Sequence, residues 1–175
     1  MKAAAKNLVD IIIWDDQTEY KSRVALVPFS EAINIQNMDS SILRSTSSGS
    51  DDKSYKKLYP RYGSKKNFYR RDTCVVERQG AYKYSDAAPN NQEARFRRMY
   101  QRTNCAIAQP VVPLSSDKTM LRNTIDSFQA SGATAGHLGT EWAWYMLSPN
   151  FANYMPSASA PDPYAPVSQP LEERE

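Results

Sequence analysis

The sequence has few of the residues that most catalytic and metal sites require. Its 175 residues include one histidine and two cysteines. It contains no Gly-x-Ser-x-Gly motif, no phosphate-binding glycine loop and no Cys-x-x-Cys pair, so hydrolytic, nucleotide-dependent and redox sites have no support. A structural zinc site needs four ligands, more than these three side chains supply. We assign no catalytic residues and expect a protein that is not an enzyme.

Long apolar runs are also lacking. The densest, Asn7–Trp14, is interrupted by Asp10 and falls well short of the roughly 20 apolar residues that a membrane-spanning helix needs. The opening MKAAAKNLVD has the pattern of an amphipathic helix and no cleavage site of a secretory signal. The length and the 41% of hydrophobic residues suit one domain, with room for an insertion.

The net charge of +3 conceals an uneven distribution. Residues 44–102 hold 15 Lys and Arg against 6 Asp and Glu, a net +9, so the remainder of the chain carries −6. Such asymmetry is typical of an inserted module or an interaction surface.

Short apolar runs near the N-terminus predict one helix and two strands. The helix is expected over Lys2–Trp14, from apolar residues at helical spacing. Val24–Val27 is a continuous apolar run, typical of a strand covered on both faces in a parallel sheet, and Pro28 should end its pairing. Ala32–Gln36 alternates and follows closely, so we expect it to pair back antiparallel as an edge strand.

Two further helices are predicted after residue 115. Ser116 is the expected N-cap of the first, and Gly132 is expected in the left-handed conformation that terminates it. Thr134 is a candidate cap of the second, which Pro149 should stop. Its core face is formed by Leu138, Trp142, Tyr145 and Met146.

Of the two tryptophans in this second helix, Trp142 shares the core face and Trp144 does not. We therefore expect Trp142 to be buried. His137, near the start of the same helix, is expected to have a structural role. From Phe151 onward the chain is rich in Pro, Ser and Ala, which predicts an extended or disordered tail.

The residue patterns typical of helices and strands are weak between residues 37 and 109. We interpret this segment as an insertion. It has a serine-rich stretch, a candidate short hairpin over 72–85 and a candidate basic helix over 91–102. Cys74 and Cys105 lie within it. They would be free buried thiols in a reducing compartment, or a disulfide in an oxidising one, and their spacing does not decide between the two.

Basic and aromatic residues interleave within this insertion, which suggests polyanion binding as an alternative function. Lysine and arginine gain affinity for phosphates through counterion release, and tyrosines offer stacking faces. The side chains concerned are Lys56, Lys57, Arg61, Lys65, Lys66, Arg70 and Arg71. Nucleic acid is not the expected ligand, because no nucleic-acid-binding motif is present, whereas lipid headgroups or polysaccharide would suit the same charge.

Three blocks of the chain resemble a known family. The blocks AAKNLVDII, RVALVPFSEAINI and PLSSDKTMLRNTIDSFQASGATAGHLGTEWAWYMLSP, with the two cysteines between them, are similar to the von Willebrand factor A-type domain of TadG-like proteins. These proteins belong to the tight-adherence (Tad/Flp) pilus assembly systems of bacteria. The resemblance covers about half of the chain, and the block from Pro113 to Pro149 is its most specific part.

The resemblance implies a Rossmann-like, doubly wound α/β fold with a mostly parallel sheet. Such domains often hold magnesium at a metal-ion-dependent adhesion site (MIDAS), built from an Asp-x-Ser-x-Ser motif, a threonine loop and a later aspartate. Thr134 matches the threonine, and Gly132, Gly136 and Gly139 would shape its loop. The other two ligand sources have no counterpart here. We therefore expect no cofactor in this chain alone, and Mg²⁺ only in the full-length protein.

These expectations divide the chain into four parts. Residues 1–36 are the first part of the A-type domain, 37–109 the basic insertion, 110–150 the second part of the domain, and 151–175 the tail. The resemblance predicts a partial domain of a membrane-anchored parent, located outside the cytoplasm, where a Cys74–Cys105 disulfide is expected. Its partners would be other pilus-assembly components or an acidic protein ligand.

The polyanion alternative is tested by salt-dependent binding. If it holds, the chain binds single-stranded DNA at low salt and releases it as the salt concentration rises, because the counterion-release term weakens. Fluorescence anisotropy of a labelled oligonucleotide measures this dependence. Absence of binding at low salt removes the nucleic-acid interpretation.

Overall fold

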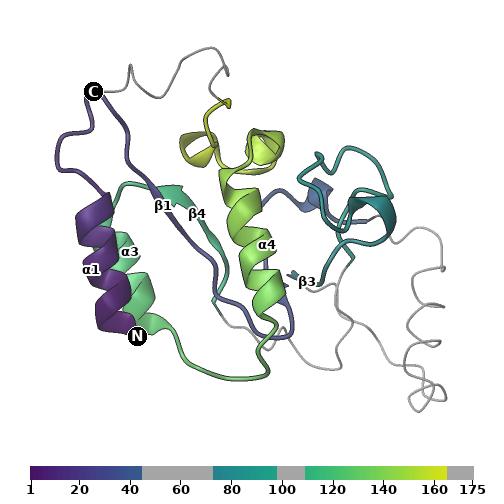
Figure 1. Ribbon diagram of the computed structural model, residues 1–175, viewed down its shortest axis with the longest axis horizontal. Helices are drawn as coiled ribbons and strands as arrows, with labels where there is room; N and C mark the ends of the chain where they lie inside the picture. The colour runs from purple at the N-terminus through teal and green to yellow at the C-terminus, as the bar shows by residue number, and fades with distance from the viewer. Residues whose placement is uncertain (45–72, 98–108, 165–175) are drawn as a thin grey trace.

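The computed structural model describes residues 1–44, 73–97 and 109–164 (Figure 1). Within these ranges, helices and short antiparallel strands are mixed along the chain, which is compatible with the expected α/β class. The helices are α1 (Lys2–Ile12), α3 (Lys118–Ser127) and α4 (Gly136–Leu147). The strands are β1 (Val24–Leu26), β2 (Ile33–Asn34), β3 (Cys74–Val75) and β4 (Val112–Ser115). Short 3-10 helices are η1 (Ser40–Ile42), η3 (Gly80–Tyr82), η4 (Pro149–Tyr154) and η5 (Ser157–Ser159).

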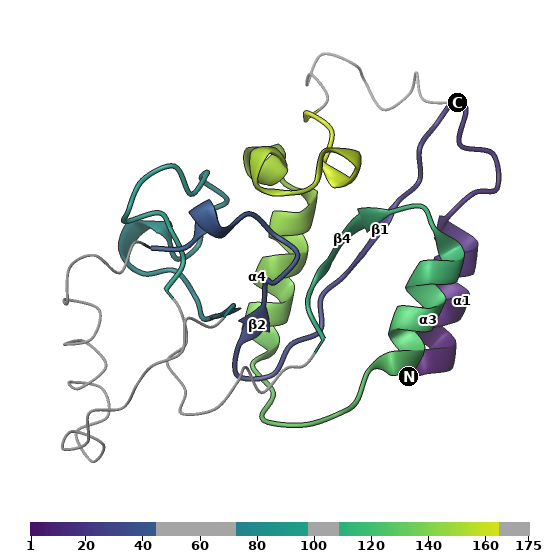
Figure 2. The same ribbon diagram turned by 180° about the vertical axis from the view of Figure 1, so that it is seen from behind.

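A two-stranded ribbon of β1 and β4 separates two helical layers. Helices α1 and α3 lie on one side of it and α4 on the other (Figures 1 and 2). Successive side chains of a strand point to opposite faces, and β1 uses both. Val24 and Leu26 pack with the cluster formed by α1 and α3, whereas Ala25 and Val27 pack with the cluster around α4. Both faces of this run therefore pack against the domain, as expected, although its side chains are only partly buried and its partner strand is not parallel.

The pairing of the described strands differs from the expected parallel sheet. Strand β1 pairs antiparallel with β4, with Val24 opposite Ser115 and an irregularity before Leu26. Strand β2 pairs antiparallel with β3, and its contact with the end of the β1 segment is a single bridge between Phe29 and Ile33. The predicted hairpin of β2 with β1 is wrong, because Pro28 and the two polar residues after Phe29 turn the chain away from β1.

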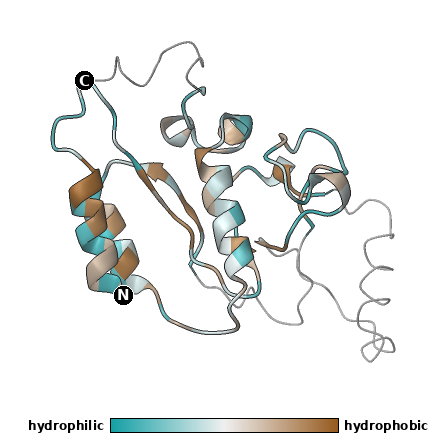
Figure 3. Cartoon of the chain, viewed as in Figure 1, coloured by the Kyte–Doolittle hydropathy of each residue, from teal (hydrophilic) through white to brown (hydrophobic). Residues whose placement is uncertain are grey.

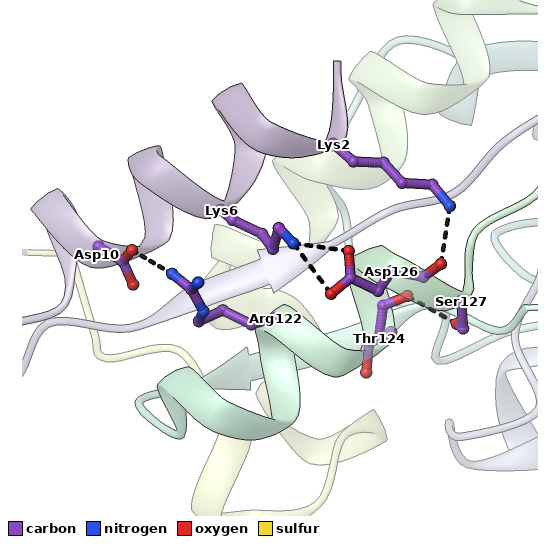
Figure 4. A network of polar contacts seen from close by, with 7 residues as sticks. All are labelled: Lys2, Lys6, Asp10, Arg122, Thr124, Asp126 and Ser127. Carbon is purple, nitrogen blue, oxygen red and sulfur yellow. Dashed lines mark hydrogen bonds and ion pairs between the residues drawn. The ribbon is translucent and has the colours of Figure 1, made fainter.

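Polar contacts and an apolar seam hold α1 against α3. Val9 and Ile13 are buried with Leu121 and Ile125 between the two helices. Around this seam, the Lys6 ammonium lies 2.8 Å from the Asp126 carboxylate, Lys2 donates to the Asp126 carbonyl, and Arg122 pairs with Asp10 (Figure 4). Asp126 has a lowered pKa because its carboxylate accepts hydrogen bonds from Lys6. Exposed pairs of this kind contribute little energy each, so the apolar seam dominates the packing.

The larger core is built around the inner face of α4. Trp142 is fully buried, whereas Trp144 is 43% exposed, as the sequence predicted. The Trp142 ring lies against Phe96, with 4.7 Å between the ring centroids, and Tyr145 stacks on Phe151. Aromatic pairs in these arrangements add to the stabilisation from burial alone.

Parts of the segment expected to be an insertion contribute to this same core. Met38, Ile42, Val75 and Phe96 are buried in the cluster that contains Trp142. The candidate basic helix is not formed over its described part, residues 91–97, where the chain makes turns and a bridge from Phe96 to Leu43. In the described ranges, the 37–109 segment is thus packed into the domain.

The tail was expected to begin at Phe151, but the chain remains packed on the domain beyond this residue. Phe151 is fully buried in the α4 cluster, and Met155 is also buried there. Beyond them, Arg23 forms an ion pair of 2.8 Å with Asp162 and donates to the Ala160 carbonyl, so residues up to 164 lie on the domain. The proline-rich composition obscured these anchors, because a few buried side chains suffice to fix an extended segment.

Helix ends differ from their predicted positions by one to several residues. Asp117, and not Ser116, caps α3 by accepting from the Met120 amide at 2.8 Å. Helix α3 ends at Ser127, so Gly132 lies in the following loop, where it does have the expected positive φ of 77°. None of the helices in the described part of the chain is long and apolar enough to cross a membrane.

The two tryptophans of α4 provide a matched test of this core. We expect Trp142→Ala to lower the free energy of unfolding by about 3–5 kcal/mol, because it leaves a large cavity next to Phe96. Trp144→Ala should cost less than about 1 kcal/mol, because that ring is 43% exposed. Urea unfolding followed by far-ultraviolet circular dichroism measures both, and equal losses would contradict the assignment of Trp142 to the core.

Candidate functional site

The loop between α3 and α4 is held against the turn that follows β1. The Ala135 amide donates to the Ser30 carbonyl at 2.9 Å, and the Ala133 amide donates to the Glu31 carboxylate at 3.3 Å. The Ser30 hydroxyl donates to the same Glu31 carboxylate at 2.5 Å. These contacts join two segments that lie about a hundred residues apart in the sequence, and they fix the shape of the loop.

Gly132 is required where this loop meets the turn. Its φ of 77° is in the region that favours glycine, and a Cβ atom here would lie 2.1 Å from the Ser30 hydroxyl oxygen. Gly139 has a similar role one turn into α4, because its Cβ would lie 2.4 Å from the Phe29 ring. Gly136, in contrast, faces open space. Two of the three glycines expected to shape the loop therefore permit a close approach, and the third does not.

Thr134 is exposed at the tip of the loop. It does not cap α4: the N-cap residue is Ala135, which has no side chain to accept the helix amides. The prediction that Thr134 caps the helix is therefore wrong. The reason is that the loop is drawn toward Ser30 by the Ala135 amide, so the helix begins one residue later than the hydroxyl would require.

A carboxylate, that of Glu31, lies next to the Thr134 loop. Magnesium requires near-octahedral coordination by oxygen atoms. The nearby carboxylate oxygen of Glu31 already accepts from Ser30 and Ala133. In the described ranges, no three His, Cys, Asp or Glu side chains are grouped so that they could hold a metal ion.

Charged side chains gather along one side of α4 near its start. His137 is 4.0 Å from Glu77, and its side chain is 66% exposed, which suits the structural role expected for it. Glu141 lies one turn after His137, and its carboxylate accepts a hydrogen bond from the hydroxyl of Tyr145, a further turn along the helix. Partial burial raises the pKa of Glu141, and burial together with this hydrogen bond raises the pKa of Tyr145. The tyrosine is thereby held as a neutral hydrogen-bond donor.

A buried arginine that sequence reasoning missed supports this side of α4. Arg78 is fully buried, and its guanidinium donates to four backbone carbonyls, those of Tyr82, Ser85, Ala87 and Ala94. It also lies over the Tyr145 ring, 5.3 Å from the centroid. No pattern distinguished this arginine from its many basic neighbours, because its partners are backbone atoms of a loop with little regular structure.

Asp86 links the same loop to the end of α4. Its carboxylate accepts from the buried Ser148 hydroxyl at 2.7 Å and from the Tyr164 hydroxyl at 2.8 Å. The hydrogen bond from Ser148 is the main cause of the lowered pKa of Asp86. Three segments therefore meet at one carboxylate, and we assign it a structural role.

The remaining predicted residues fall partly outside the described ranges. Cys74 is buried at the start of β3 and is disulfide-bonded. Cys105, the other member of the predicted pair, lies outside the residues that the structure describes. So do the seven basic residues of the polyanion alternative, Lys56, Lys57, Arg61, Lys65, Lys66, Arg70 and Arg71.

Comparison of the chain with protein-family models, with curated proteins and with solved structures finds no match.

Two glycines of α4 test the close approach of this helix to Phe29. Gly139→Ala should lower the free energy of unfolding by about 1–3 kcal/mol, because the new methyl group overlaps the Phe29 ring. Gly136→Ala should be neutral or stabilising by up to about 1 kcal/mol, because it has space and alanine favours a helix. Thermal and urea unfolding of both variants measures the difference. A neutral Gly139→Ala would show that Phe29 does not pack here.

Glu141 should make stability depend on pH. Its pKa is raised above 4.5 in the folded state, so at pH values just above 4.5 the folded protein binds more protons than the unfolded chain. The free energy of unfolding therefore falls as the pH rises from about 4.5 through the folded-state pKa of Glu141. Glu141→Gln removes the titration and keeps an oxygen that can accept from Tyr145. The unfolding free energy of the variant relative to the wild type should therefore increase from about pH 4 to neutrality. A difference that does not change with pH would contradict the assignment.

Proposed function

We propose that this chain is a non-enzymatic, adhesion-type binding module and part of a TadG-like pilus-assembly protein. The observation that carries the proposal is the loop of Gly132 and Thr134, which is anchored on Ser30 and Glu31 and presents the threonine to solvent. A loop whose backbone is fixed and whose tip is exposed is suited to recognition.

The arrangement of the helices supports a partial von Willebrand factor A-type fold. Helices cover both faces of the β1–β4 ribbon, as in doubly wound α/β domains (Figure 1). The antiparallel pairing of β4 with β1 is compatible with such a domain, because many doubly wound sheets carry an antiparallel strand at one edge. On this proposal β4 is that edge strand.

The disulfide at Cys74 supports a location outside the cytoplasm. Disulfides persist in oxidising compartments and are rare in the cytosol. The partner would be another pilus-assembly component or an acidic protein ligand. In the full-length protein, Mg²⁺ bound near Thr134 would supply a positively charged position for an acidic group.

Site-specific photo-crosslinking tests the proposal. A photoreactive residue is placed at Thr134. The matched control places it at Thr119, which is also an exposed threonine but lies on α3. The variants are expressed in the bacterium that encodes the chain, and the crosslinked proteins are identified by mass spectrometry. We expect Thr134, and not Thr119, to capture a pilus-assembly component, and we expect loss of surface pili when the gene is deleted.

Two outcomes would overturn the proposal. One is normal piliation after deletion of the gene. The other is capture at Thr134 of the same proteins as at Thr119, because the loop would then have no specific partner.

A further inference from the structure

Residues 156–164 form a strap that lies against the end of the β1–β4 ribbon. The first part of the strap, η5, contacts β4, and its last part is bound by Arg23, the residue before β1 (Figure 2). Within the strap, Pro161 is the only buried residue. The segment after η5 is pale or teal in Figure 3, whereas much of α1 is brown. The strap is therefore held chiefly by polar contacts.

The guanidinium of Arg23 holds the strap at three points. It donates to the carbonyls of Ala158 at 3.5 Å and Ala160 at 2.8 Å, and it forms the 2.8 Å ion pair with the Asp162 carboxylate. These acceptors come from every second residue of the strap. Only 14% of the Arg23 side chain is exposed, so protein acceptors replace much of the water around its charge.

The bound part of the strap has the conformation of many peptide ligands. Ala160 has φ −63° and ψ 131°, close to polyproline II values, and prolines stand on both sides of Asp162. A segment that is extended before it binds loses little conformational entropy on docking. The charged hydrogen bonds of Arg23 select a carboxylate within that segment. The contact is therefore one that an extended, proline-containing acidic peptide makes with a binding site.

Few contacts oppose the release of the strap. A second tie joins the Tyr164 hydroxyl to the Asp86 carboxylate at 2.8 Å. Asp162 is 80% exposed in its side chain and Tyr164 is 64% exposed, so both ties face water, where each is worth little. Segments with few buried apolar contacts open at a free-energy cost well below that of global unfolding. Once the strap opens, the Arg23 guanidinium is available to another carboxylate.

We propose that Arg23 is the docking point for an extended, proline-containing acidic segment of a partner protein, and that residues 156–164 occupy this point as an internal competitor. Because the strap is part of the same chain, its effective concentration at Arg23 is about millimolar. A partner segment must displace it, so partner binding is coupled to strap release.

This docking point is separate from the Thr134 loop. The strap follows the C-terminal end of α4, whereas Thr134 precedes the first residue of that helix, Gly136. The proposal therefore does not depend on the function proposed for the loop, and it can fail or hold by itself.

Binding of a labelled peptide to the full-length protein tests the docking point. The probe is the chain's own segment 155–164, MPSASAPDPY, and fluorescence anisotropy measures its affinity. Asp162→Ala removes the carboxylate of the internal competitor and keeps Arg23, so we expect it to bind the probe more tightly than the wild type by roughly tenfold or more. The matched control is Asp126→Ala, which removes an exposed ion pair of the same 2.8 Å length on α3. It should bind as weakly as the wild type.

A second probe needs no further change in the protein. The same peptide with asparagine in place of aspartate should bind Asp162→Ala more weakly by roughly tenfold or more, because Arg23 loses its charged acceptor. Hydrogen exchange follows the strap itself. The amides of Ser159 and Ala160 should exchange faster than that of the buried Ile125 in the wild type, and faster still in Asp162→Ala. Circular dichroism checks that both variants are folded.

Several results would overturn the proposal. One is the absence of binding to Asp162→Ala at probe concentrations up to about 1 mM. Another is equal affinity of Asp162→Ala and the wild type, or of the two peptides for Asp162→Ala. Strap amides that exchange as slowly as that of Ile125 would show that the strap is a fixed part of the core and does not open.

Discussion

The buried guanidinium of Arg78 is the interaction on which the larger core depends. A charged group without solvent is costly unless its hydrogen-bonding capacity is satisfied. Here four carbonyls from residues 82–94 converge on it, and the Phe96 and Tyr145 rings cover it. A loop with little regular structure is thereby fixed around one side chain, and Phe96 is brought against Trp142.

Helix α4 transmits this order to the candidate site. Its buried face contacts the aromatic cluster, while Gly139 at its start lies against Phe29 and Ala135 bonds the turn after β1. The position of the exposed Thr134 therefore depends on packing at the far end of α4. Tyr145 lies more than about 10 Å along the helix from its first residue, Gly136, since each residue of an α-helix adds about 1.5 Å. The binding proposal rests on this rigidity, because a fixed loop loses less entropy on association.

The sequence predicted those structural features that neighbouring residues determine. Helical spacing located α1, α3 and α4, and the pattern of α4 distinguished the buried Trp142 from the exposed Trp144. The positive φ of Gly132 was also predictable, because few other residues adopt it. The placement of Thr134 near Glu31 was not, since no local pattern relates two segments about a hundred residues apart.

Interactions with backbone atoms were the least predictable. Arg78 resembles the other basic residues of its region, and only the folded loop shows that carbonyls surround it. The partner of β2 was missed for a similar reason: strand pairing is chosen by long-range geometry, and the closest apolar run in sequence is not always the neighbour in space. The anchoring of Phe151 likewise depends on buried side chains from distant segments.

The pairing of α1 with α3 also has a consequence during biosynthesis. The Lys6–Asp126 contact joins residues 120 positions apart, so α1 leaves the ribosome long before its partner helix exists. At roughly 5–20 residues per second, the interval is about 6–24 s. Throughout it, Val9 and Ile13 of α1 lack the α3 side chains that bury them in the folded protein. Helix α1 therefore reaches its final packing only after α3 has been made.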